Sequence, residues 1–229
     1  VEAGLRSDNR AMPEEINRIL TDHACDLLFA PTEEAVGRLA AEGIKGERVV
    51  RTGDVMLDAA RLYGPVARGK SGILDELQAE PGAFALCTLH RAENVDNRDI
   101  LSSLLAGIGE VSKNLPIVLP LHPRTKDRLD KFDLRETLAP GIRLLEPLGF
   151  LDILCLQADA ALILTDSGGM QKEAFFQHVP CVTLRTETEW VETVEVGWNV
   201  VLGGEVESLA GMVDAVAKPA AMGAPGAHG

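Results

Sequence analysis

The segment Thr165-Asp166-Ser167-Gly168-Gly169 has the residue types of a site that holds phosphate groups. It follows an apolar run and precedes a helical pattern. A helix that begins at Ser-Gly-Gly presents backbone N–H groups and the positive end of its dipole, which suit a pyrophosphate. Glycines let the backbone approach the phosphate oxygens, and Glu173 on the same helix is near enough to reach a ribose diol. An ordinary strand-to-helix turn with a solvated Glu173 explains the same residues equally well, because glycine motifs are common.

Two further segments, Thr88–Asn94 and Leu119–Thr125, place basic side chains at the ends of apolar runs. Ligands of open α/β sheets bind beyond the carboxyl ends of the strands. There His90 could donate a proton or contact a phosphate, and Arg91 suits a phosphate or a carboxylate. Prolines on both sides of His122 restrict its backbone. For His90 and Arg91, a capping histidine beside a surface arginine is the commoner role, but three strand ends with such residues favour a shared site.

A set of carboxylates, Glu2, Glu14 and Glu15, lies between and beside Arg6 and Arg10. Paired carboxylates near arginines can transfer protons. Acidic residues at a helix start with exposed ion pairs are the commoner arrangement, and residue type alone favours that interpretation.

Short apolar runs alternate with helical patterns along the chain, which predicts a parallel, doubly wound α/β sheet. A helix is expected from Pro13 to about Asp26, with one apolar stripe made of Ile16, Ile19, Leu20, Ala24 and Leu27. The loop Leu184–Trp190 could close over a sugar or simply pack. The expected strands are Leu27–Ala30, Val49–Thr52, Phe84–Thr88, Ile117–Leu121, Arg143–Leu145, Ala161–Thr165, Cys181–Leu184 and Val200–Leu202. Further helices are expected over Ile100–Val111, Leu148–Gln157 and Gly169–Gln177.

We expect a domain change near Gly53. Residues 1–52 complete a first domain, residues 53–217 form a second with six strands, and residues 218–229, rich in Ala, Gly and Pro, form a tail. The chain opens on Val1, and its first seven residues have the pattern of a domain interior. We therefore expect a fragment that lacks the front of its first domain.

The overall composition argues against several classes of protein. The net charge of −13 disfavours non-specific binding to nucleic acid and docking on anionic lipid, and no apolar run is long enough to cross a bilayer. The four cysteines are far apart and form no Cys-x-x-Cys pair, so neither a zinc site nor a disulfide framework is indicated. We expect buried, reduced thiols in a cytoplasmic protein with no nucleic-acid or membrane partner.

Five segments in register resemble the non-hydrolysing UDP-N-acetylglucosamine 2-epimerase family along nearly the whole chain, to about Gly204. The loop Arg185–Glu192 looks most like the branch that acts on precursors of bacterial surface polysaccharides, which includes enzymes for a 2,3-diacetamido uronic acid. The five segments are Val1–Ser7, Met12–Arg18, Thr88–Asn94, Leu119–Thr125 and Leu164–Ala174.

The resemblance implies a GT-B type fold, with two Rossmann-like doubly wound parallel-sheet domains of which the first is truncated here. It implies that UDP-GlcNAc and UDP-ManNAc are interconverted by elimination and re-addition of UDP with proton transfer at C2. The family needs no organic cofactor and no metal, and the resemblance implies a UDP-sugar substrate and a homodimer.

The resemblance also assigns roles to residues of this sequence. Glu2, Glu14 and His90 match the family's catalytic residues. Arg91 and His122 match positions near a second, activating UDP-GlcNAc site, and Arg91 also belongs to the substrate-binding set. The UDP-binding set matches the diphosphate cradle Ser167, Gly168 and Gly169, the ribose-binding Glu173, and the uracil loop Pro147, Leu148, Gly149 and Phe150.

The chain departs from the family pattern at three places. A proton-transferring aspartate would lie before Val1, the closing helix is cut short, and Trp190 stands where some members carry arginine. Three alternatives stay open: a UDP-2,3-diacetamido-uronic acid 2-epimerase, a GT-B glycosyltransferase, and an inactive UDP-binding fragment. Glu2 and Glu14 favour the epimerase over the transferase, because an epimerase must move the C2 proton.

Overall fold

A computed structural model describes residues 2–203 and 209–216 of the 229-residue chain. The chain divides into two compact units, residues 1–58 and residues 59–225, called here the first and the second unit. The expected tail over residues 218–229 lies outside the described residues. The domain boundary expected at residue 53 stays a prediction.

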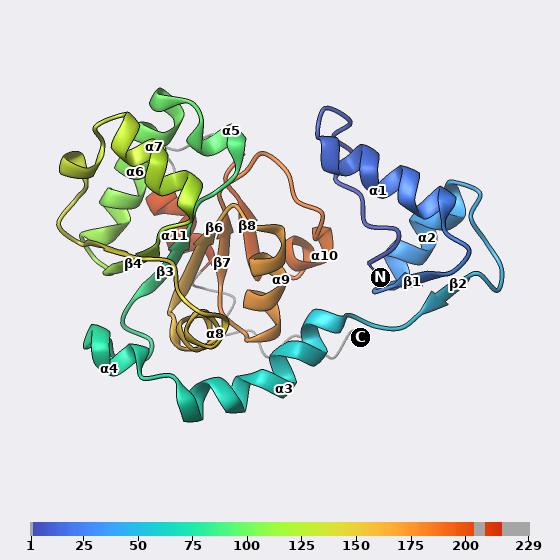
Figure 1. The fold of residues 1–229 in the computed structure, drawn as a ribbon, viewed down its shortest axis with the longest axis horizontal. Coiled ribbons are helices and arrows are strands. Elements are labelled where there is room, and N and C mark those ends of the chain that lie inside the picture. Colours follow the sequence, from blue (N-terminus) through green and yellow to red (C-terminus); the bar gives the residue numbers. More distant parts are fainter. Residues whose placement is uncertain (1, 204–208, 217–229) are drawn as a thin grey trace. The chain divides into compact units, whose positions relative to one another are not determined.

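The first unit contains two parallel strands and two helices. Strands β1 (Leu28–Ala30) and β2 (Val49–Arg51) pair side by side, and helices α1 (Pro13–Ala24) and α2 (Glu33–Ala41) precede and separate them (Figure 1). Pro13 occupies the first turn of α1, where its missing N–H costs nothing. Thr32 caps α2 by accepting a 3.1 Å hydrogen bond from the N–H of Ala35. The core consists of Ala3, Leu28, Ala30, Ala35, Leu39 and Ile44.

Helix α1 does not bury its apolar stripe within this unit. Leu20 and Leu27 of the predicted stripe are 62% and 51% exposed, and the helix ends at Ala24 instead of near Asp26. The buried residues of α1 are Glu15 and Asp22. Each of these carboxylates accepts hydrogen bonds from the segment before the helix, so burial leaves neither charge without a partner.

The second unit is built on one parallel sheet of six strands, in the order β5-β4-β3-β6-β7-β8. All six expected strands are confirmed to within one residue at each end, and the continuously apolar pattern corresponds to burial on both faces. The strands are β3 (Ala85–Thr88), β4 (Ile117–Pro120), β5 (Ile142–Leu145), β6 (Leu162–Thr165), β7 (Cys181–Thr183) and β8 (Asn199–Val201).

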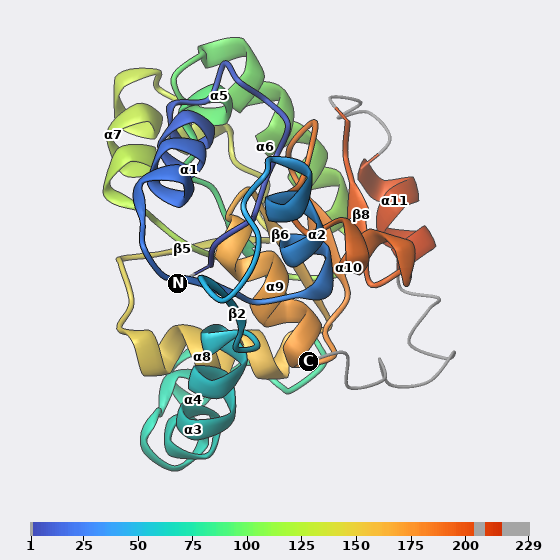
Figure 2. The ribbon, with the colours of Figure 1, turned by 90° about the vertical axis from the view of Figure 1, so that its right-hand side faces the viewer.

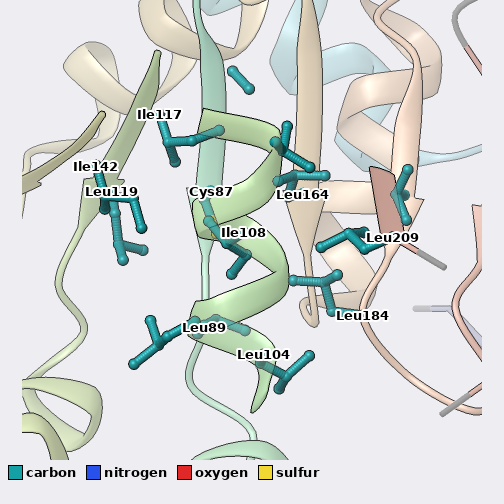
Figure 3. Close-up of a cluster of buried hydrophobic side chains, with 14 of the residues drawn as sticks. Cys87, Leu89, Leu104, Ile108, Ile117, Leu119, Ile142, Leu164, Leu184 and Leu209 are labelled. Atoms are coloured by element: carbon teal, nitrogen blue, oxygen red, sulfur yellow. The ribbon is translucent and has the colours of Figure 1, made fainter. Parts of the chain in front are cut away.

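Helices cover both faces of this sheet (Figure 1, Figure 2). On one face, α6 (Arg98–Ser112), α7 (Pro123–Lys131) and α11 (Leu209–Val216) pack on alternate strand residues, and Figure 3 shows Leu104 and Ile108 of α6 in this core. The other face packs on α3 (Val55–Lys70), α4 (Ile73–Leu77), α8 (Phe150–Asp159) and α9 (Gly168–Phe176). The short elements α5 (Ala92–Val95), η1 (Arg135–Thr137) and α10 (Val191–Glu195) lie in the connections.

The strand order fixes where a ligand can bind. From β3 the chain adds β4 and β5 on one side, then returns to add β6, β7 and β8 on the other. The order therefore reverses between β3 and β6. In open α/β sheets the ligand crevice forms beyond the carboxyl ends of the strands at this point.

The three cysteines in apolar runs, Cys87, Cys155 and Cys181, are buried, while Cys25 is exposed, and all four are free thiols. Burial raises the pKa of Cys181 to about 12. None of the described helices combines the length and the apolar character that a membrane span requires.

Candidate ligand site at the switch point of the sheet

Asp166 organises the carboxyl end of β3 and β6. Its side chain is completely buried directly after β6. One carboxylate oxygen, Oδ2, accepts hydrogen bonds from the backbone N–H of Arg91 at 2.9 Å and from Nδ2 of Asn94 at 3.1 Å. The backbone N–H of His90 donates to both oxygens, at 3.0 and 3.1 Å. A single carboxylate thus holds the turn that follows β3.

The pairing of β3 with β6 brings these residues together. Thr88 is the register partner of Thr165, and their hydroxyl oxygens lie 2.7 Å apart. His90 and Asp166, which follow these two strands, are therefore neighbours, although they are 76 positions apart in the sequence. Burial alone would raise the pKa of Asp166, but the hydrogen bond with His90, the charge of that ring and the backbone N–H donors lower the pKa below its ordinary value.

The two predicted histidines lie beside one another. Nδ1 of His90 is 3.1 Å from Oδ1 of Asp166, and its half-buried ring is 5.4 Å from the ring of His122 between centroids. His122 is exposed and caps α7, because its Nδ1 accepts a 3.2 Å hydrogen bond from the N–H of Arg124. His122 therefore has a structural role as the N-cap of α7. Its role in ligand binding stays a prediction.

Ser167 caps α9 at the same edge of the sheet. Its hydroxyl accepts a 3.4 Å hydrogen bond from the N–H of Met170, and its own N–H donates to Oγ1 of Thr165 at 3.0 Å. Helix α9 begins at Gly168, and Ser167, Gly168 and Gly169 are all half-buried. The predicted strand–Ser–Gly–Gly–helix arrangement is confirmed. It places the positive end of a nine-residue helix next to the turn that Asp166 holds.

The loop that follows β7 packs against α9. Arg185 and Glu189 form a buried ion pair with 2.9 Å between Nη1 and Oε2. The buried indole of Trp190 donates a 2.7 Å hydrogen bond to the carbonyl of Gly168. Nζ of Lys172 lies 4.4 Å from the centre of the Trp190 ring and 2.5 Å from Oε1 of Glu192. The loop thus packs against α9, and its closure over a sugar stays a prediction.

The residues expected to bind a nucleoside lie on the same unit. Glu173 is half-buried, and its carboxylate accepts a 2.6 Å hydrogen bond from Nε2 of Gln157. In the predicted base-binding loop, Pro147, Gly149 and Phe150 are exposed and Leu148 is half-buried. The Phe150 ring meets the Tyr63 ring edge-on, with 5.7 Å between centroids.

Glu2 and Glu14 belong to the first unit, and both are exposed. Glu2 adopts a left-handed backbone, with φ of 64°. Partial burial of its carboxyl group, then the negative charge of Asp54, raise the pKa of Glu2 above its ordinary value. Glu14 stands in the first turn of α1, as the sequence predicts.

Arg6 lies beside Glu2 and Glu14 in the sequence, but in the structure it pairs with other carboxylates. Its guanidinium is buried and pairs with Asp22 at 2.8 Å and with Glu42 at 2.7 Å. A buried guanidinium needs acceptors around it, and Asp22 and Glu42 supply them.

Three residues of the second unit make contacts that the sequence patterns do not indicate. Asp166, within the predicted phosphate turn, also holds the neighbouring histidine turn. Arg185 and Trp190, in the loop after β7, are both buried. The one available signal was the position of Asp166, directly after a buried strand that ends beside another.

Comparisons with known proteins agree with this geometry. A profile of the family described as UDP-N-acetylglucosamine 2-epimerase matches residues 1–225. The chain belongs to this family. The resemblance inferred from the five sequence segments is therefore confirmed.

Among related epimerases, the UDP-N-acetylglucosamine 2-epimerase of Methanocaldococcus jannaschii is 45% identical over 216 residues, which cover 91% of this chain and 59% of the relative. The UDP-2,3-diacetamido-2,3-dideoxy-D-glucuronate 2-epimerase of Pseudomonas aeruginosa is 46% identical over 206 residues, covering 89% and 56%. The chain thus spans less than two thirds of the length of these epimerases.

The crystal structure of the M. jannaschii epimerase in complex with UDP-GlcNAc and UDP is similar to the structure of this chain. The TM-score is 0.89 at 44% identity, and the match covers 95% of this chain and 61% of that one. The expected α/β fold of the GT-B type is confirmed by this similarity and by the parallel sheets of both units.

Proposed function

We propose that this protein interconverts UDP-GlcNAc and UDP-ManNAc as a non-hydrolysing 2-epimerase. The observation that carries the proposal is the junction of β3 and β6 in a member of this family. There the N-terminus of α9 and the ring of His90 share one edge of the sheet, and Asp166 is the residue between them. The reaction must bring a diphosphate and a proton-transferring group together.

In this proposal the second unit binds the UDP moiety. Ser167, Gly168 and Gly169 hold the diphosphate with the start of α9, where backbone N–H groups and the helix dipole favour anions. Glu173 binds the ribose diol, and the hydrogen bond from Gln157 fixes its carboxylate. The uracil lies against the loop Pro147–Phe150.

The reaction begins with removal of the C2 proton by a carboxylate. As the C1=C2 double bond forms, the bond between C1 and the UDP oxygen breaks, and UDP leaves with the electron pair. Return of UDP to C1 and of a proton to the other face of C2 completes the inversion. We assign the proton transfers to Glu2 and Glu14, with His90 acting at the UDP side. The raised pKa of Glu2 suits a group that must bind and release a proton.

The uronic acid branch is the second candidate, because the P. aeruginosa relative that acts on a diacetamido glucuronate is 46% identical to this chain. The two candidates differ in the charge of the sugar, since a uronate adds a carboxylate. Turnover of the two UDP-sugars, compared at equal concentration, separates them.

Three further features belong to the proposal. Arg91 and His122 contribute to a second, activating UDP-GlcNAc site. The protein is a cytoplasmic homodimer, and its product enters polysaccharide biosynthesis. No cofactor or metal takes part in the reaction. The 45% identity to the M. jannaschii epimerase supports carrying these family features over to this chain.

The decisive experiment follows the C2 proton by NMR in deuterated water. The product should carry deuterium at C2. Glu2→Gln and Glu14→Gln should slow this incorporation far more than they weaken UDP binding. If no deuterium enters and the UDP-sugar is consumed only when an acceptor is added, the protein is a glycosyltransferase. If UDP binds but nothing is turned over in the whole protein, it is a UDP-binding module.

A further inference from the structure

The contact between Asp166 and His90 determines which nitrogen of the histidine carries its proton. Nδ1 of His90 lies 3.1 Å from Oδ1 of Asp166, within hydrogen-bond distance. The carboxylate also accepts from the backbone N–H groups of His90 and Arg91 and from the amide of Asn94. These three groups can only donate in this arrangement, so they favour an ionised carboxylate.

An ionised carboxylate can only accept hydrogen bonds. The hydrogen in the contact therefore belongs to Nδ1 of His90. In the neutral imidazole one nitrogen carries a hydrogen and the other accepts, so Nε2 is left with its lone pair. The Asp166 side chain is 0% exposed, which keeps water from competing with His90 for this carboxylate.

The turn around His90 is built to keep this geometry. The N–H of His90 donates to the Asp166 carboxylate, and Nδ1 of the same residue lies 3.1 Å from it, so one carboxylate contacts both the backbone and the ring. Asn94 adds a second tie, because its Nδ2 also donates to the carbonyl of Leu184 at 2.8 Å. Leu184 directly follows β7. The carboxylate is thus anchored to three neighbouring strands.

We propose that Asp166 is the positioning residue that holds His90 in the Nδ1–H tautomer and presents Nε2 to the UDP-sugar. The proposal rests on the proposed function for the identity of the ligand, but the tautomer itself does not depend on it. Nε2 is then the atom that accepts a proton on the diphosphate side of the substrate, and it can give that proton back once the ring has been protonated. Asp166 itself touches no substrate.

The first test measures the tautomer in the chain itself. Nitrogen-15 chemical shifts of the imidazoles distinguish the two neutral forms, and the His90→Gln variant identifies the His90 signals among the five histidines. We expect the neutral ring of His90 to carry its proton on Nδ1. An Nε2–H tautomer in the unmodified chain would overturn the proposal, whether or not any variant folds.

The second test uses Asp166→Asn with a matched control. The asparagine amide keeps the size of the side chain but has only one oxygen that can accept hydrogen bonds. In the unmodified chain the donors around Asp166 contact two carboxylate oxygens. We expect a mixture of His90 tautomers. Asn94→Ala removes one donor to the same carboxylate and leaves the His90 contact in place, so it should keep the Nδ1–H tautomer. Retention of that tautomer in Asp166→Asn would mean that another group fixes the ring.

The third test reads the consequence for turnover in the whole protein. A wrongly protonated histidine should lower kcat by about 10²-fold or more, as loss of a general acid–base group does, while KM and the affinity for UDP change less than about threefold. An unchanged kcat in Asp166→Asn would overturn the positioning role. If the unmodified protein incorporates no deuterium yet shows the Nδ1–H tautomer, the proposed function fails and the tautomer assignment stands.

Discussion

The indole N–H of Trp190 donates a 2.7 Å hydrogen bond to the backbone carbonyl of Gly168. This bond joins the loop after β7 to the first turn of α9. The same indole lies under Nζ of Lys172, which pairs with Glu192 on α10. Two contacts therefore fix the start of α9: the cap formed by Ser167 and the hydrogen bond from Trp190 in the loop after β7. A helix start that must bind an anion benefits from being fixed before the ligand arrives.

Two substitutions of Trp190 should destabilise the second unit to different extents. Trp190→Phe loses the hydrogen bond to Gly168 but keeps a ring under Lys172, so the free energy of unfolding should fall by about 1 kcal/mol. Trp190→Ala leaves a cavity and should cost about 3–5 kcal/mol. Urea unfolding followed by circular dichroism measures both. Trp198→Phe, at another buried indole, is the control, and equal stability of Trp190→Phe and the unmodified chain would contradict the role of the bond.

The chain should bind UDP more tightly than UMP. The second phosphate adds charge-assisted contacts at Ser167 and the first N–H groups of α9, each worth about 1.5–3 kcal/mol, or about 10- to 100-fold in Kd. Calorimetric titration of both nucleotides gives the ratio. Ser167→Ala should reduce the ratio, whereas Glu173→Ala should weaken both ligands alike because both contain ribose. Equal affinities for UDP and UMP would refute the diphosphate assignment.

His90→Ala should lower turnover of the whole protein by about 10²–10⁴-fold, the range for loss of a general acid–base group. The fold should persist, because the N–H of residue 90 can still donate to Asp166. Circular dichroism and UDP titration check the fold and the nucleotide site. Near-normal turnover would mean that the role of His90 is structural.

Acid should loosen the N-terminal segment through Glu15. Burial alone would raise the pKa of Glu15, but hydrogen bonds from Ser7, Arg18 and Asp8 lower it. A folded-state pKa below the unfolded value means that the stabilisation is fully present above the ordinary glutamate pKa of about 4.3 and is lost as the pH falls through the folded value.

Hydrogen exchange of the Ser7 and Asp8 amides measures this effect, after correction for the intrinsic pH dependence of exchange. Protection should be constant from neutral pH to about pH 5 and should then decrease towards lower pH. Glu15→Gln should give weaker protection that does not change with pH in this range. A pH-dependent profile in Glu15→Gln would assign the effect to another carboxylate.

Gly4 should tolerate no side chain. Its φ is +83°, and a Cβ built on it would lie 2.3 Å from the carbonyl oxygen of Ala35. Gly4→Ala should destabilise the first unit by about 2–5 kcal/mol, the sum of backbone strain and overpacking. Gly43 has nearly the same φ, +85°, with open space around it, so Gly43→Ala should cost only about 1–2 kcal/mol. Exchange protection of the Ala3 amide, which donates to Phe29, compares the two.

The sequence by itself determined the elements of this protein and the family. Continuous apolar runs such as Ile117–Pro120 and Leu162–Thr165 indicate strands buried on both faces, because a half-exposed strand would alternate. Ser167 before two glycines marks the start of α9 because a hydroxyl acceptor caps the helix there. These signals are local, so they can be read without knowing what the chain packs against.

Only the tertiary structure decided which residues face one another. Whether Asp166 meets a phosphate or His90 depends on the pairing of β3 with β6, which no local pattern encodes. In the same way, α1 buries Glu15 and Asp22, although Leu20 is the more apolar residue. The backbone N–H groups of Ser7 and Gly4 need acceptors at those places. Polar residues are buried where distant partners satisfy their hydrogen bonds, and only the folded chain as a whole decides where those partners lie.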